Sequence, residues 1–97
     1  MTKLLSIKRS DKTDKKWMAT FETESGRKKT THFGQKNADD FTLTGDQEQR
    51  SRYRKRHAKD LLTMDPTRAG MLSYWLLWGD SQSLQSNLAT YKHRYNL

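Results

Sequence analysis

The 97-residue sequence contains no cysteine and no valine, and it has a single proline and a single isoleucine. Without cysteine the chain can form neither disulfides nor thiolate metal sites, which fits a reducing compartment. A core must therefore come from the eleven leucines, ten aromatic residues and four methionines. Hydrophobic residues make up only 32% of the chain, against roughly 45% in ordinary globular domains. Aromatic side chains bury large areas, so we expect one small domain with a thin stability margin.

A recognisable catalytic constellation is also missing. The only candidates for acid–base or metal chemistry are the three histidines, His32, His57 and His93, and the pair Asp39-Asp40. Their spacings match no zinc pattern, and the acidic pair is typical of a loop or a helix cap. The glycines are isolated, so there is no phosphate-binding loop. The sequence predicts a non-enzymatic protein with no metal, cofactor or small-molecule substrate.

Long apolar runs are absent as well. The apolar stretch near Met1–Lys8 is too short for a signal peptide or a membrane span, and no other run reaches the required length. We therefore expect a protein that is not secreted and does not span a membrane.

The first third of the chain has the pattern of a β-meander. Lys15–Thr23 alternates in polarity, with Trp17, Ala19 and Phe21 on one face. Three strands are expected, at residues 4–9, 15–23 and 27–33, joined by a polar turn at 10–14 and a turn at Gly26. Three strands need a layer packed on their apolar face to be stable.

Helix signals follow a polar connection over residues 35–45. Asp46 is an N-cap candidate for a helix to about Leu62, with Gln49 at the capping-box position. Asp65-Pro66 predicts a second start, and Gly79 a stop. A third helix is expected from Asp80 or Ser81 onward, where apolar residues recur at helical spacing.

The expected fold class is α+β: a small N-terminal antiparallel β-meander of two to three strands packed against three C-terminal helices. Residues 1–97 form one domain, with the meander in 1–34, the connection in 35–45 and the helical part in 46–97.

Eight residues, Met71–Trp78, form the most apolar segment of the chain. On a helix they are apolar nearly all round, which predicts burial on several sides against the Trp17 and Phe21 face. In the other interpretation Trp75 or Trp78 is exposed as an anchor for a partner protein, because tryptophan is favoured at interface hot spots.

The net charge is +8, and the most basic segment, Arg50–Lys59, carries six positive charges and no acid. On a helix, Arg52, Arg56 and Lys59 form a stripe with Lys55 beside it. The candidate residues for binding an anion or partner are Arg50, Arg52, Arg54, Lys55, Arg56 and Lys59, together with a second cluster, Arg27, Lys28 and Lys29. Tyr53 and His57 either add stacking to this surface or form the buried side of the helix. A solvated face without a partner is the plain alternative.

Most of the chain resembles a group of small uncharacterised proteins encoded by large (giant) DNA viruses of algae and protists. The matching pieces are His32-Phe33-Gly34, Asp40-Phe41-Thr42, Arg52 to His57, Asp65-Pro66, Ala69-Gly70 and Trp75 to Trp78. The resemblance implies a viral setting, in the virion or in the cytoplasm or nucleus of the infected cell, and carries no known activity.

Two functions fit this setting. In the first, the protein is a structural or interaction component, such as a minor capsid protein, whose basic faces and tryptophans contact acidic viral structural proteins. In the second, helix 46–62 binds nucleic acid without sequence preference, because no base-reading motif is present. We expect the first, with little nucleic-acid affinity at physiological salt.

Overall fold

The structure is a computed structural model that describes all residues from Met1 to Leu97. Three strands, β1 (Lys3–Arg9), β2 (Lys15–Glu22) and β3 (Lys28–Gln35), form an antiparallel sheet in the order β1-β2-β3. The expected meander is confirmed, including the turn at Gly26, which has a φ of 82°. This left-handed conformation is open to glycine at little cost.

The inner face of the sheet is the one that the alternation in β2 predicts. Ala19 and Phe21 are fully buried, and Trp17 is half-buried against the core. Their neighbours across the strands, Leu4 and Phe33, are buried too. A β-bulge between residues 4 and 6 interrupts the pairing of the β1 edge.

The helical half begins earlier than expected and is more divided. A short helix, α1 (Phe41–Thr44), lies inside the predicted connection and is capped by Asp40. Asp46 caps α2 (Gln47–His57), as predicted, by accepting from the amides of Glu48 and Gln49. The helix then tightens to a 3₁₀ segment, η1 (Ala58–Thr63), and ends at Met64 in the left-handed conformation.

The expected helix start at Asp65-Pro66 is wrong. Asp65 accepts hydrogen bonds from the amide and the hydroxyl of Thr67, at 3.0 and 2.7 Å, and so caps a turn instead. The hydroxyl bond lowers the pKa of Asp65 below its usual value. Thr67 is in turn held by β3, because its carbonyl accepts from Thr31 and its hydroxyl from Lys29. The helix therefore starts only at α3 (Ala69–Leu72).

The apolar segment continues from α3 into a π-helical turn, η2 (Ser73–Leu77), in which the amide of Trp78 donates to the carbonyl of Ser73. The helix does end near Gly79, as predicted, but Gly79 does not act as a left-handed C-cap. Gly79 lacks a positive φ, and a β-carbon there would lie 2.2 Å from the Trp75 carbonyl. The last helix, α4 (Leu84–Arg94), is capped by Ser83 rather than by Asp80 or Ser81.

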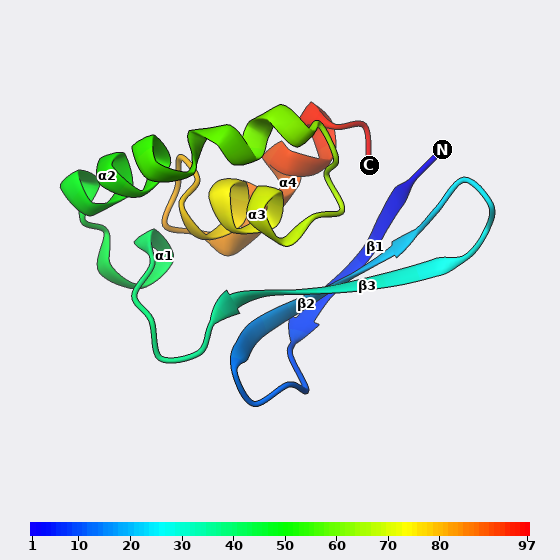
Figure 1. Cartoon of the computed structure of the whole chain (residues 1–97), viewed down its shortest axis with the longest axis horizontal. Coiled ribbons are helices and arrows are strands. Elements are labelled where there is room, and N and C mark those ends of the chain that lie inside the picture. The colour runs from blue at the N-terminus through cyan, green and yellow to red at the C-terminus, as the bar shows by residue number, and fades with distance from the viewer.

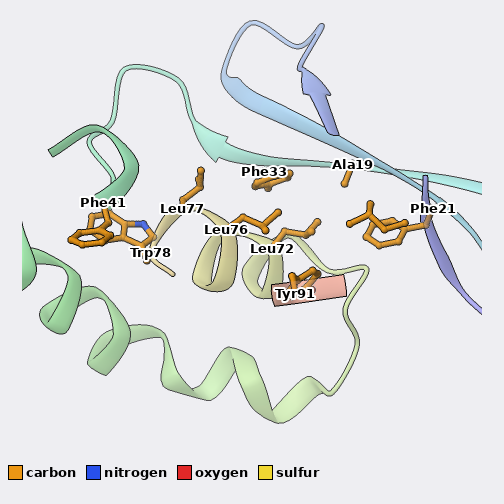
Figure 2. Close-up of a cluster of buried hydrophobic side chains, with 10 residues drawn as sticks. Ala19, Phe21, Phe33, Phe41, Leu72, Leu76, Leu77, Trp78 and Tyr91 are labelled. Carbon is orange, nitrogen blue, oxygen red and sulfur yellow. The ribbon is translucent and has the colours of Figure 1, made fainter. Parts of the chain in front are cut away.

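All the helices lie on one side of the sheet, and the segment of α3 and η2 lies closest to it, against β3 (Figure 1). Figure 2 shows Phe33, Ala19 and Phe21 of the sheet facing Leu72 and Leu76, with Tyr91 of α4 beyond them. Every residue of Met71–Trp78 except Ser73 and Trp75 is buried. The apolar segment is therefore the central core helix. No helix of the structure is long and apolar enough to cross a membrane.

Candidate binding surface on the basic helix

Two of the six predicted cations of the segment Arg50–Lys59 point into the fold. Arg50 donates from Nε to the Gly79 carbonyl at 2.7 Å and pairs with Asp80, also at 2.7 Å. Arg54 donates from Nε to the Trp78 carbonyl at 2.9 Å and reaches the same carboxylate at 3.3 Å. Both arginines satisfy carbonyls that the end of η2 leaves without helical partners. They hold the basic helix on the body and are not free to bind a partner.

The aromatic candidates are also part of the fold. The ring of Tyr53 stacks on Trp78, with centroids 4.5 Å apart, and on His57, with centroids 4.1 Å apart. Burial, with a smaller contribution from Asp60, raises the pKa of Tyr53 to about 12. Tyr53 and His57 thus lie on the side of α2 that faces the fold, and the Tyr53 ring is stacked between two other rings.

Trp75 is the more exposed of the two candidate tryptophans, although it is still half-buried. Its indole Nε1 donates to the Tyr95 hydroxyl at 3.0 Å, and the guanidinium of Arg94 lies 4.1 Å from the ring centroid. These contacts occupy the indole N–H and one ring face, so Trp75 serves mainly to hold α4 on the core.

The remaining four cations of the segment Arg50–Lys59, Arg52, Lys55 and Arg56 of α2 and Lys59 of η1, are exposed. We call them the cation row. The only ion pair that any of them forms is between Arg52 and Glu48, 4.0 Å apart, and both side chains are mostly in solvent. Such an exposed pair contributes little energy. The cation row is therefore a free positive surface on a helix that is fixed from its other side.

The second basic cluster does not extend this surface. Arg27, Lys28 and Lys29 lie at the turn between β2 and β3, at the opposite end of the molecule's long axis from α2 (Figure 1). Lys29 also donates to the Thr67 hydroxyl at 2.8 Å, so its ammonium is partly engaged.

A cleft of about 700 Å³ opens beside the cation row, between α2, the start of α3 and the adjoining ends of β2 and β3. Its charged lining residues are Lys15, Lys16, Asp39, Asp40, Arg56 and Asp60, with His57 among the polar ones. Within it Lys16 and Asp40 form an ion pair at 2.6 Å that is almost fully buried. The sequence marked Asp39-Asp40 as a loop or cap. It gave no sign that Lys16 of β2 would pair with Asp40.

The three histidines are separate in the fold. His32 Nδ1 forms a hydrogen bond with the Ser10 hydroxyl at 2.7 Å, while His57 Nδ1 lies 3.3 Å from the Asp60 carboxylate. No three histidine or acidic side chains come together in a way that could hold a metal ion.

Comparison with known proteins gives one match. No curated protein and no solved structure is similar to the chain. Residues 5–57, more than half of the chain, match the model of a protein family. The match runs from within β1 through β2, β3 and α1 to the end of α2. The protein belongs to this family, DUF5754, a family of unknown function.

Proposed function

We propose that this protein is a non-enzymatic interaction protein that binds an acidic surface of a partner protein through the cation row. The observation that supports this is that the cations on the two sides of α2 make different contacts. Arg50 and Arg54 anchor the helix to Gly79, Trp78 and Asp80, and the row on the other side has no buried acid to neutralise it. Because the helix that carries the row is already anchored, binding an acidic surface does not have to order its backbone, which lowers the entropy cost.

Nucleic acid is the second candidate, and the geometry favours it less. From Arg52 to Lys59 the row rises only ~10 Å along the helix, at about 1.5 Å per residue. Four phosphate contacts predict a loss of affinity of roughly a hundredfold between 50 and 200 mM salt. Tyr53, which could have stacked on a base, is already sandwiched between Trp78 and His57. Binding would thus depend on a few screened charges alone.

The resemblance to proteins of large DNA viruses supports a particle as the setting, where the partner would be another viral structural protein. We propose a minor capsid or virion-associated component. Mass spectrometry of purified particles is the direct test, with proteins of the infected-cell lysate as the background. Recovery of the chain only in the lysate would contradict the virion assignment.

The binding mode is tested with two labelled probes, a poly-glutamate peptide and a random 20-base-pair DNA, by fluorescence anisotropy at physiological salt. The triple variant Arg52→Glu, Arg56→Glu, Lys59→Glu should lose peptide binding at least tenfold. A matched variant with the same charge change, Lys8→Glu, Lys12→Glu, Lys28→Glu, should keep it, since these exposed lysines lie on the sheet and its turns. Tight DNA binding that the first variant abolishes would assign the row to nucleic acid instead. Equal losses of peptide affinity in both variants would show that binding depends only on the net charge of the protein and not on the cation row.

A further inference from the structure

The ammonium group of Lys16 has one N–H donor that makes no hydrogen bond within the protein. It donates to the Ala38 carbonyl at 2.5 Å and to the Asp40 carboxylate at 2.6 Å, while its side chain is only 12% exposed. A lysine ammonium has three N–H donors, so one has no protein acceptor. Lys16 lines the cleft beside α2. A nearly buried cation with an unused N–H donor at an open cleft favours the binding of an anionic group of another molecule.

Two more cations line the same cleft from different elements. Lys15 comes from β2 and Arg56 from α2, and neither forms an ion pair within the fold. The cleft is thus lined by three cations from two elements, Lys15 and Lys16 of β2 and Arg56 of α2, which can approach a bound anion from two sides.

The acidic residues of the cleft are mostly committed to other groups. Asp40 accepts from Lys16 and from both the amide and hydroxyl of Thr42. Asp60 lies 3.3 Å from His57. Asp39 is exposed and has no cation partner, so it is the one acid that opposes a bound anion.

We propose that the cleft receives one carboxylate side chain of an acidic peptide segment whose neighbouring acids lie along the cation row. This deepens the proposed function and rests on it. The two surfaces are continuous, because Arg56 belongs to both. The volume of about 700 Å³ lies within the range of ~300–1,000 Å³ typical of ligand sites. The partner is thus recognised by an inserted acidic side chain as well as by surface charge.

The test is the affinity of a labelled hexaglutamate peptide for single variants at physiological salt, each checked for an unchanged melting temperature. Lys15→Glu should weaken binding about tenfold. Lys12→Glu makes the same charge change in the exposed turn next to the cleft strand and should stay within twofold. Asp39→Asn should tighten binding two- to threefold, and a gain cannot come from damage to the fold. Arg52→Glu reports on the cation row alone, because Arg52 does not line the cleft.

Glycine amides provide a second reading in ¹H–¹⁵N spectra of the unmodified protein. Gly34 and Gly70 line the cleft, while Gly26 lies at the distant turn of the sheet. Added hexaglutamate should shift the first two signals and leave the third in place.

The two proposals fail in different ways. If Arg52→Glu weakens binding while Lys15→Glu matches Lys12→Glu and the signals of Gly34 and Gly70 stay still, the cleft inference is overturned and the cation row stands. If no variant changes the affinity, both are overturned. If inorganic phosphate or free glutamate shifts the two glycine signals as much as the peptide does, and Arg52→Glu has no effect, the cleft binds a small anion and the peptide inference is overturned.

Discussion

Arg54 donates a hydrogen bond from its Nε to the carbonyl oxygen of Trp78, across 2.9 Å. This bond joins the most basic segment of the chain to the end of its most apolar one. The same guanidinium lies 5.1 Å from the centroid of Tyr74 and 5.5 Å from that of Trp75. The charge of Arg54 is thus used to close the core rather than to attract a partner.

Replacing Arg54 with Gln should lower the free energy of unfolding by about 2 kcal/mol, since a charge-assisted bond to a half-buried carbonyl and the pair with Asp80 are both lost. Urea denaturation followed by tryptophan fluorescence measures the change. Arg52→Gln is the matched control on the same helix. It should stay within about 0.5 kcal/mol, because the Arg52 side chain is 60% exposed. Equal effects of the two changes would contradict the anchoring role.

The neighbours Asp39 and Asp40 should differ sharply in their effect on stability. Asp40→Ala leaves the Lys16 ammonium nearly buried without its carboxylate and removes the cap of α1. Breaking a buried pair from one side costs ~3 kcal/mol or more. Asp39→Ala should change the stability by less than about 0.5 kcal/mol, because its side chain is exposed. Thermal unfolding of the two variants side by side gives the comparison, and similar melting temperatures would show that the ion pair carries little weight.

Alkaline pH should destabilise the protein through two tyrosines. The pKa of Tyr53 is raised from 10.0 to about 12, mainly by burial. Burial, with smaller contributions from Tyr95 and Asp65, also raises the pKa of Tyr91, whose hydroxyl donates to the Pro66 carbonyl. The folded state therefore holds protons that the unfolded state releases near pH 10. This stabilisation is complete below pH 10 and is lost as the pH rises toward 12.

Tyrosine absorbance near 295 nm, recorded against pH together with circular dichroism, should show part of the ionisation coinciding with unfolding. Tyr53→Phe removes one of the two groups and should make the alkaline transition shallower. Complete ionisation of all four tyrosines with the fold intact would contradict the expectation.

The sheet could be predicted because its signals are local. The alternation around Ala19 and the conformation of Gly26 depend on neighbours in sequence, and so does the cap of Asp46 on Glu48. The predicted helix start at Asp65 is wrong because its capping oxygen serves a turn, and that turn is held by a hydrogen bond from Thr31, 36 residues away from Thr67. Tertiary bonds decided between two uses of the same local motif.

The candidate surface was predicted only in part for the same reason. The basic segment was correctly placed on a helix, and the stripe of Arg52, Arg56 and Lys59 is exposed. The sequence could not separate these residues from Arg50 and Arg54, because what distinguishes the latter is Asp80 and two carbonyls some 24 to 30 residues later. The cleft draws its lining from six elements, so no single stretch of sequence carries its signal.

The link between η2 and α4 depends on the amide of Asn87, a buried polar side chain. Its Nδ2 donates to the carbonyls of Leu76 and Ser81, at 3.0 and 2.7 Å, and its Oδ1 accepts from the Ser81 amide at 3.1 Å. Asn87→Asp keeps the shape but sets a carboxylate oxygen against two carbonyl oxygens. The loss of both donors and the buried charge should cost ~3 kcal/mol or more at pH 7.

The pH dependence of this variant separates charge from shape. Carbonyl neighbours and burial favour the protonated form of the new carboxyl, so the folded state binds a proton more tightly than the unfolded state does. The destabilisation of Asn87→Asp relative to the unmodified protein should therefore shrink as the pH falls from 7 toward 4, in urea titrations at each pH. Gln85→Glu, at an exposed position of the same helix, makes the same neutral-to-acid change and should cost less than about 0.5 kcal/mol at pH 7. A penalty for Asn87→Asp that stays constant over this pH range would mean that packing around Asn87, and not its two donated hydrogen bonds, holds α4 against the apolar segment.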